Sequence, residues 1–154
     1  MEFELDLETE SVAEAQPRRP LCVDRAATVR QTMRRMQAEN TSSAMICDGD
    51  KLVGVWTEKD AVKIMSEGGN LDAPIETVMV RDPIQLTPDD SVGKAIELMA
   101  VGRFRRLPIV DGAGAVQGVL KVSGILHYLV EHFPQIVYTL PPSPHYKPAD
   151  REGA

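Results

Sequence analysis

Apolar residues follow one pattern twice along this chain, and the first copy begins at Pro20. A short apolar run at 20–23 precedes a helical pattern with apolar residues at i, i+4 and i+7, and both features recur at an offset of 63. The apolar positions are Val29, Met33 and Met36 in the first copy, and Val92, Ile96 and Met99 in the second. Thr28 and Ser91 directly precede these runs, at positions where a hydroxyl typically caps a helix. The spacing therefore predicts two related helices, each preceded by a short strand.

A hairpin and a second helix complete each copy of the pattern. The apolar runs 44–47 and 107–110 are each followed by Asp-Gly, a strong signal for a tight turn between two strands. The second turn is one residue longer, so Gly54 corresponds to Gly118 at an offset of 64. We predict that the final helices bury Ala61, Ile64 and Met65 in the first copy, and Leu126, Leu129, Val130 and Phe133 in the second.

The pattern divides the chain into two repeats of the order β-α-β-β-α, at residues 20–69 and 70–133. A unit of about 50–60 residues buries too little surface to be stable alone, so we expect one α+β module with a shared core. An acidic segment, 1–19, is expected to form a flexible arm. The segment 134–154 holds five of the eleven prolines, and it could be disordered or could dock on the body or on a partner.

Charge and hydropathy narrow the classes of function. The net charge is −6, and residues 1–20 carry six acidic side chains against two arginines. This balance argues against binding to nucleic acid and gives no attraction to an anionic membrane. No apolar run is long enough to span a bilayer and the acidic start has no hydrophobic signal segment, which favours a cytoplasmic protein without a membrane span.

Candidate metal ligands and nucleophiles are scarce. Cys22 and Cys47 lie in apolar runs without metal-like or redox-motif spacing, so we expect buried free thiols in a reducing compartment. The histidines, His127, His132 and His145, have no second ligand at a suitable spacing, and no metal site is predicted. No local pattern pairs a nucleophile with a base, so the chain is not expected to be an enzyme.

The most informative stretch is Gly54-Val55-Trp56-Thr57-Glu58-Lys59-Asp60, where a buried strand runs directly into a helix. Thr57 and Asp60 at a helix start resemble a capping box, a purely local device, but they could also face a ligand. The same outline recurs at 118–124, where Lys121 replaces Thr57 and Gly124 replaces Asp60. If the first pair holds a ligand, the chain has one good binding site and one degraded copy.

Taken with the motif Arg105-Arg106-Leu107-Pro108-Ile109-Val110-Asp111, these repeats resemble a tandem pair of cystathionine-β-synthase (CBS) domains, also called a Bateman module. The resemblance covers residues 20–133. It implies a pseudo-twofold unit with two clefts, of a kind that often binds AMP, ADP, ATP or S-adenosylmethionine. Such modules regulate an attached or partner protein, are not usually catalysts, and commonly form dimers through their helices.

The resemblance implies roles for two residues of the first cleft. Asp60 matches the family acid that accepts hydrogen bonds from ribose hydroxyls, and a carboxylate suits that task because it has two acceptor oxygens. Thr57 matches the hydroxyl residue near the first phosphate, and it opens a helix whose free N–H groups and dipole favour an anion.

Further residues of the first cleft follow from the same resemblance. The adenine base is expected against an apolar wall and a stretch of backbone formed by Val55, Pro83, Ile84 and Gln85. Arg105 and Arg106 match basic positions that meet phosphate in some members, where a guanidinium makes charge-assisted hydrogen bonds. On a regular strand these two side chains point to opposite faces, so we expect at most one to enter the cleft unless the backbone bends.

The second cleft departs from the family pattern. Its corresponding residues are Lys121, Gly124, Leu21 and Ser42, with Ser43 beside the last. Without the acid, a ribose would lose its main acceptor, and affinity would fall by about ten- to hundredfold. Lys121 could still hold an anion, but we expect this cleft to be empty or weak.

Two hypotheses of function follow. The first is a regulatory module that binds an adenosine nucleotide between its repeats, with magnesium only beside a bound polyphosphate. It would work as a homodimer and signal to an effector protein on another chain through a population shift. The alternative is a ligand-independent dimerisation or adaptor module that acts through its surface and its Pro-rich tail.

Overall fold

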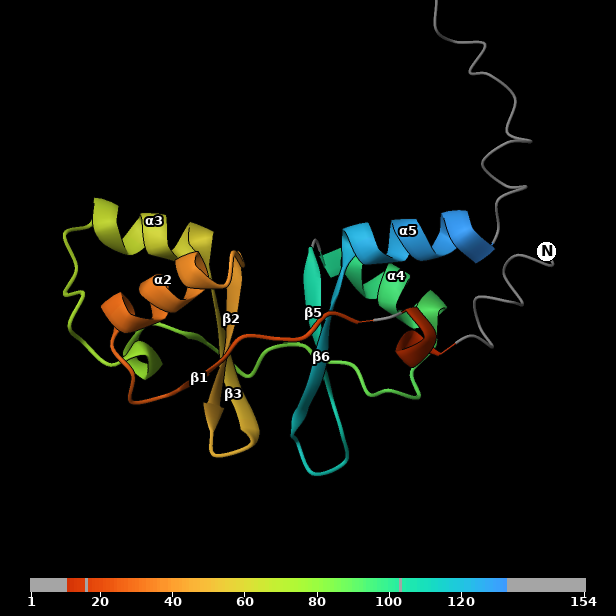
Figure 1. The fold of residues 1–154 in the computed structure, drawn as a ribbon, viewed down its shortest axis with the longest axis horizontal. Helices are drawn as coiled ribbons and strands as arrows, with labels where there is room; N and C mark the ends of the chain where they lie inside the picture. The colour runs from red at the N-terminus through yellow and green to blue at the C-terminus, as the bar shows by residue number, and fades with distance from the viewer. Residues whose placement is uncertain (1–10, 16, 103, 133–154) are drawn as a thin grey trace, which may run out of the picture.

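The computed structural model describes residues 11–15, 17–102 and 104–132, which form two similar halves side by side (Figure 1). The first half contains β1 (Cys22–Asp24), α2 (Val29–Ala38), β2 (Ser43–Asp48), β3 (Lys51–Thr57) and α3 (Glu58–Ser66). The second contains α4 (Val92–Gly102), β5 (Arg106–Val110), β6 (Val116–Lys121) and α5 (Val122–His132). The predicted first strand of the second half is reduced to a single parallel bridge between Leu86 and Ile109.

The two sheets differ in size because the first recruits an extra strand. Its order is β1-β2-β3-β4, in which β1 and β2 are parallel and the other pairs are antiparallel. The added strand β4 (Val80–Arg81) pairs with Gly54 and Val55 of β3. In the second half β5 and β6 form a two-stranded antiparallel sheet.

The predicted helix caps are present at the first helix of each half. At α2 the Gln31 N–H donates to Thr28 Oγ1 (3.0 Å) and the Thr28 N–H donates to Gln31 Oε1 (2.9 Å). At α4 the Lys94 N–H donates to Ser91 Oγ (3.0 Å). These bonds satisfy N–H groups that have no partner inside a helix, and so they define where each helix begins.

Each half has its own apolar core, which corrects the expectation of a single shared core. In the first half, buried side chains of β1, α2, β2 and β3 surround Trp56, which is 1% exposed. In the second, α4, α5 and the β5–β6 hairpin enclose Leu107, Ile109 and Leu120. Each sheet therefore buries one face against its own pair of helices.

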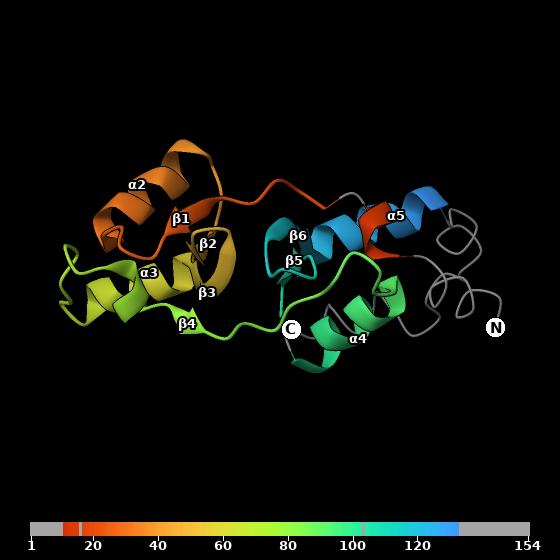
Figure 2. The ribbon, with the colours of Figure 1, turned by 90° about the horizontal axis from the view of Figure 1, so that it is seen from below.

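The halves exchange their leading segments. A short 3₁₀ helix, η1 (Val12–Ala15), inserts Val12 into the core of the second half, and the Val12 N–H donates to Asp90 O (2.8 Å). Its counterpart in the second copy of the pattern, η2 (Ile75–Thr77), inserts Ile75 into the core of the first half. Figure 2 shows the two connections that cross between the halves, one before β1 and one after β4.

This exchange corrects the prediction of a flexible arm over residues 1–19. Residues 1–10 lie outside the described part, but Val12 is fully buried and Arg18 pairs with Val119 of β6 through reciprocal backbone hydrogen bonds of 3.1 and 3.0 Å. The segment was missed because it offers only a short apolar anchor and no periodic run. The predicted Pro-rich tail, 134–154, also lies outside the described residues.

Three predicted core positions and one predicted buried cysteine are wrong. Met65, Leu126 and Val130 are 48%, 62% and 39% exposed, and Cys22 is exposed whereas Cys47 is buried. In α5 the buried positions are Ile125 and Tyr128 instead, because the helix starts directly at the end of β6 and this junction fixes the face that meets the sheet. Phe133 lies outside the described residues.

None of the helices in the described part of the chain is both long enough and apolar enough to cross a lipid bilayer.

Candidate functional site

A cavity of about 840 Å³ lies where the two halves meet, and it contains most of the residues predicted for the first cleft. Every residue predicted for that cleft except Gln85 lines it, namely Val55, Thr57, Asp60, Pro83, Ile84, Arg105 and Arg106. Gln85 is exposed and lies outside the cavity, since the chain turns its neighbour Leu86 into the core of the second half.

Thr57 and Asp60 are joined at the start of α3. Thr57 has extended backbone (φ −128°) and the helix begins at the next residue, so Asp60 reaches back over the helix start. The Thr57 N–H and the Thr57 hydroxyl both donate to Asp60 Oδ2, at 2.9 and 3.0 Å. Both bonds use one oxygen, and among the described residues Oδ1 has no hydrogen-bond donor. The carboxylate therefore caps the helix and keeps one acceptor oxygen for the cavity.

The two final helices begin in equivalent surroundings. The Glu58 N–H at the start of α3 donates to Ser42 O (3.0 Å), and the Val122 N–H at the start of α5 donates to Arg105 O (3.0 Å). Each helix start is thus tied to the residue just before the central hairpin of its own half. The pseudo-twofold relation between the halves extends to these backbone contacts.

Both arginines of the Arg-Arg-Leu-Pro motif line the cavity, although at most one was expected to do so without a bend. The strand β5 begins at Arg106, so Arg105 stands before it and does not follow the alternation of a strand. Arg106 Nη2 donates to Ser42 Oγ, while Arg106 Nε is buried and has no hydrogen-bond partner in the described residues. Arg105 is exposed, so its guanidinium is accessible at the rim.

The cavity contains residues that the sequence interpretation did not assign, among them Asp82, Val80 and Phe104. Asp82 has φ +48°, a left-handed conformation that is uncommon for a residue other than glycine and is often found at functional sites. The available signal was the Asp82-Pro83 dipeptide, since an aspartate before proline often marks a turn.

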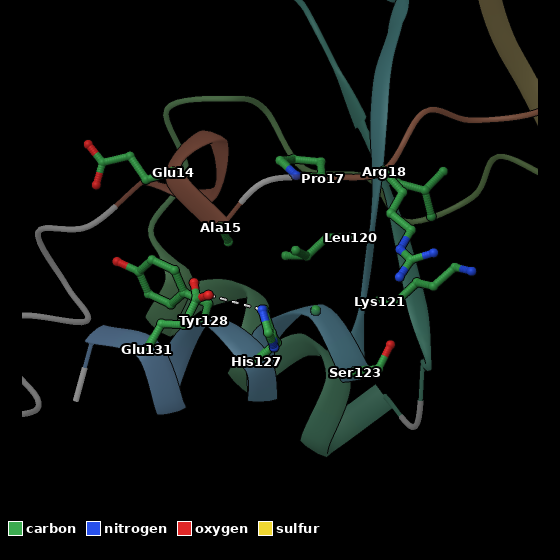
Figure 3. Close-up of a pocket in the computed structure, with 12 residues that line it drawn as sticks. Glu14, Ala15, Pro17, Arg18, Leu120, Lys121, Ser123, His127, Tyr128 and Glu131 are labelled. Atoms are coloured by element: carbon green, nitrogen blue, oxygen red, sulfur yellow. Dashed lines mark ion pairs between the residues drawn. The ribbon is translucent and has the colours of Figure 1, made fainter. Parts of the chain in front are cut away.

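A second cavity, of about 400 Å³, lies beside the start of α5 (Figure 3). Lys121 and Gly124 line it, as predicted, together with Arg18 and Ser123. The other two predicted residues lie elsewhere. Leu21 is buried in the core of the first half, and Ser42 lines the first cavity. The register of the exchanged segment explains the difference, because Pro17 and Arg18 occupy the edge of β6.

Electrostatics separate the two cavities. Acidic and basic side chains mix in the first, which Asp60 and Asp82 line together with Arg105 and Arg106. In the second, burial is the main cause that lowers the pKa of Lys121, and the positive charges of Arg106 and Arg18 lower it further. Within the described part, no cluster of three or more histidine, cysteine, aspartate or glutamate side chains is arranged to hold a metal ion.

The duplicated α+β unit with a cavity between its halves defines a tandem-repeat module, and comparison with known families identifies it. The model of the CBS domain matches residues 12–67 and 75–131, and the chain belongs to this family. The two matches start at Val12 and Ile75, the residues with which η1 and η2 dock on the opposite halves.

The relatives that contain this module differ in length. A 17.7 kDa protein of Acidianus ambivalens is 30% identical over 105 residues, which span 68% of this chain and 63% of that protein. The CBS domain-containing protein CBSCBSPB3 of Arabidopsis thaliana is 33% identical over 110 residues, but these span only 20% of it. The protein MJ1232 of Methanocaldococcus jannaschii is 30% identical over 112 residues, 37% of its length. The chain thus covers less than two thirds of each of these relatives.

Solved structures share the fold. The CBS domain protein PAE2072 of Pyrobaculum aerophilum, in complex with AMP, superposes with a TM-score of 0.70 at 23% identity over 79% of this chain and 98% of that one. The CBS domain pair of MJ0100, in complex with 5′-methylthioadenosine and S-adenosyl-L-methionine, gives a TM-score of 0.72 at 21% identity, over 80% and 98%. At these identities the likeness establishes the fold alone.

Proposed function

We propose that this module is a sensor that binds an adenosine nucleotide or a related adenosine compound in the cavity between its halves. The observation that carries the proposal is the Asp60 carboxylate at the cavity wall, where Oδ2 accepts both bonds from Thr57 and Oδ1 has no hydrogen-bond donor among the described residues. An oriented carboxylate with an unused acceptor suits a ribose, whose neighbouring hydroxyls are donors.

The remaining walls suit the other parts of such a ligand. The helix start at Thr57 and the guanidinium groups of Arg105 and Arg106 favour a phosphate. The buried Nε of Arg106, which has no partner in the part of the chain that the structure describes, would gain one from it. The apolar surfaces of Val55 and Ile84 suit a planar base. Gln85 has no part in this arrangement because it lies outside the cavity.

The identity of the ligand within this class is proposed from cavity size and charge. A cavity of about 840 Å³ is in the usual range for small-molecule sites and has room for AMP, ADP, ATP or S-adenosylmethionine. Similar folds have been solved with AMP and with S-adenosyl-L-methionine. A polyphosphate would bring magnesium with it, since the cavity also contains the carboxylates of Glu58 and Asp82.

The helical side of the module is proposed to form a homodimer. Figure 1 shows α3 and α5 along the same side, and both carry exposed apolar residues. Val62 of α3 is 63% exposed and Leu126 of α5 is 62% exposed, with Met65, Val122 and Val130 beside them. Apolar side chains gathered on one side typically mark an interface. Ligand binding across both halves would then alter the surface offered to an effector on another chain.

Thermal unfolding of the protein with AMP, ADP, ATP and S-adenosylmethionine tests the proposed ligand class. A ligand at one hundred times its dissociation constant should raise the free energy of unfolding by about 2.7 kcal/mol. Asp60→Asn keeps an oxygen for the Thr57 N–H but removes the carboxylate, and it should abolish most of this shift. Asp50→Asn, in the exposed β2–β3 turn, is the matched control. A folded protein that responds to none of the four compounds would contradict the proposal.

The same exposed helices favour the alternative function, a ligand-independent dimerisation or adaptor module. It predicts that Asp60→Asn leaves self-association and partner binding unchanged, whereas Leu126→Lys disrupts the dimer. Analytical ultracentrifugation of the two variants, with and without AMP, distinguishes the hypotheses. Dimerisation that depends on AMP and is lost in Asp60→Asn would reject the adaptor.

A further inference from the structure

The two cysteines are far apart in the sequence but lie on one face of the first sheet. In the parallel β1–β2 pair, Val23 is the partner of Ile46, and both side chains pack in the core of the first half. Cys22 precedes Val23 and Cys47 follows Ile46, so both cysteines belong to the opposite face. They are diagonal neighbours across the two strands, and the Cys47 thiol donates a hydrogen bond to the Cys22 sulfur.

The two thiols differ in their access to solvent. Cys22 is exposed and belongs to β1, which is the edge strand of its sheet. Cys47 belongs to β2, between β1 and β3, and is only 6% exposed. A small reagent in solvent therefore reaches Cys22, whereas Cys47 is shielded and has the Cys22 sulfur as a neighbour.

The surroundings of Cys22 favour its thiolate, which is the nucleophilic form of a cysteine. The hydrogen bond from Cys47 lowers the pKa of Cys22 to about 7 against the opposing effect of burial, and the charge of Arg35 lowers it further. Arg35 is held there because its Nη1 donates to Cys22 O at 3.0 Å. The same thiol–thiol bond and burial raise the pKa of Cys47, which therefore stays protonated. The pair thus combines one reactive sulfur with one protonated neighbour.

The position of β1 lets the two sulfur atoms approach each other. A disulfide brings its sulfur atoms to about 2 Å, closer than two thiols in hydrogen-bond contact. The strand β1 has only three residues and pairs on one side alone. Backbone hydrogen bonds hold it to β2 at both ends, from Met45 N to Leu21 O (2.8 Å) and from Arg25 N to Cys47 O (3.0 Å). A small shift of this edge strand therefore disturbs no other strand pair.

We propose that Cys22 and Cys47 are a modification site, at which a peroxide oxidises Cys22 and Cys47 then closes an intramolecular disulfide. The Cys22 thiolate attacks one oxygen of hydrogen peroxide, so that an S–O bond forms, the O–O bond breaks and hydroxide leaves as water after taking up a proton. The Cys47 sulfur then attacks the sulfenic acid sulfur of Cys22. The S–S bond forms, the S–O bond breaks, and the departing oxygen takes the Cys47 proton and leaves as water. Two thiols are oxidised and one peroxide is reduced to two water molecules.

The disulfide would fasten the segment that crosses between the halves. Residues 17–21 lead from the edge of β6 into β1, and a bond from Cys22 to Cys47 would tie the end of this connection to the central hairpin of the first half. Neither cysteine lines the adenosine cavity. The inference is therefore independent of the proposed ligand.

Peroxide treatment of the reduced, folded protein tests the pair directly. Intact mass should fall by two hydrogen atoms per chain, peptide mapping should join Cys22 to Cys47, and dithiothreitol should restore both thiols. Cys47→Ser should stop at a sulfenic acid on Cys22, which dimedone captures. In Cys22→Ser the remaining thiol is buried and should react at least about tenfold more slowly. Circular dichroism confirms that each variant is folded.

A second pair of variants tests the surroundings of Cys22. Arg35→Gln removes a positive charge beside the thiolate, so it should slow the reaction of Cys22 with peroxide at pH 7 by about two- to fivefold. Arg34→Gln, at the neighbouring exposed arginine of α2, is the matched control and should leave the rate unchanged. The pH profile of the rate should have its midpoint near pH 7 in the native protein and at a higher pH in Arg35→Gln.

Three outcomes would overturn the inference. The first is a folded native protein that retains both thiols after peroxide treatment. The second is a disulfide that joins Cys22 of one molecule to Cys22 of another, and the third is a native protein that stops at the sulfenic acid. Failure of the protein to bind AMP would instead contradict only the proposed function of the cavity between the halves.

Discussion

The starts of α3 and α5 occupy the same place in their halves yet differ in charge. Each follows a strand directly, and each begins with an N–H that donates to a backbone carbonyl 3.0 Å away. At α3 the neighbouring side chains are Thr57 and Asp60, whereas at α5 they are Lys121 and Gly124. The backbone thus supplies two equivalent helix starts, and the side chains beside them differ in charge and in their capacity to accept a hydrogen bond.

The contrast continues in the exchanged segments. Asp82 lines the first cavity, and its counterpart in the first copy of the pattern is Arg19. The preceding residues of the two segments, Arg81 and Arg18, are both basic and pair with Gly54 and Val119 on the edges of β3 and β6. Positions that hold the fold together are therefore alike in the two halves, while positions that face the cavities have diverged.

The largest effect on stability is expected from truncating the buried residues of η1 and η2, which dock on the opposite halves. Ile75→Ala should lower the free energy of unfolding by about 2–5 kcal/mol, and Val12→Ala by about 1.5–3 kcal/mol, because both side chains are fully buried. Urea denaturation measures both values. If Val12→Ala changed stability by less than about 0.5 kcal/mol, as is usual at the surface, the docking of η1 would be refuted and the predicted arm restored.

Exchanging the side chains beside the two helix starts should move adenosine binding from the first cavity to the second. Thr57→Lys combined with Asp60→Gly should weaken AMP binding by about ten- to hundredfold, since a charged acceptor is lost. The reverse pair, Lys121→Thr with Gly124→Asp, should add a second, weaker AMP site. Isothermal titration gives the stoichiometry and affinity, and an unchanged stoichiometry in the reverse variant would show that the exchanged segments also control ribose binding.

Arg106 is expected to contribute to ligand binding in the first cavity, which it lines. Its guanidinium donates to Ser42 in the first cavity, and its charge acts on Lys121 beside the second. Arg106→Gln should weaken AMP binding by about tenfold, because one charge-assisted contact to the phosphate is lost. Arg34→Gln, an exposed arginine of α2, controls for net charge. Titration of AMP into both variants is the measurement, and an unchanged affinity in Arg106→Gln would show that this side chain does not meet the phosphate.

The smallest effect concerns the pH dependence of stability without ligand. The pKa of Lys121 is lowered in the folded state from its ordinary value of 10.5, so between these two values the unfolded chain binds more protons than the native one. Stability therefore rises with pH in this window, and the repulsion is fully present below it. Lys121→Gln should be more stable than the native protein at neutral pH, and the difference should close towards pH 10.5. Thermal melts across this range measure it, and a constant difference would contradict the assignment.

The sequence predicted the repeats well wherever a periodic run or a cap marks an element. Val29 and Val92 set the first helices, and the lining of the first cavity followed from the resemblance of Thr57, Asp60 and their neighbours to one family. These features depend on local pattern, or on a motif whose backbone surroundings are shared among relatives. They could therefore be inferred without coordinates.

What could not be predicted depends on contacts between distant segments. Val12 and Ile75 occupy equivalent places, but a single buried residue in a short 3₁₀ helix leaves no periodic trace. Arg105 lines the cavity because it stands directly before the first residue of β5 and so does not follow the alternation of the strand. The position of Leu126 on the outside of α5 follows from the β6–α5 junction, which the spacing of apolar residues alone does not determine.

The crossing of leading segments makes each half dependent on a piece of chain that the other half carries. A polypeptide severed after Gly69, at the boundary that the repeats suggest, would yield an N-terminal fragment lacking the Ile75 plug and a C-terminal fragment lacking the Val12 plug. Neither fragment would have a complete apolar core alone. Mixing the two fragments would complete both cores, because each fragment supplies the segment that the other lacks. We therefore expect the two halves to unfold together as one cooperative unit, rather than as two independent domains.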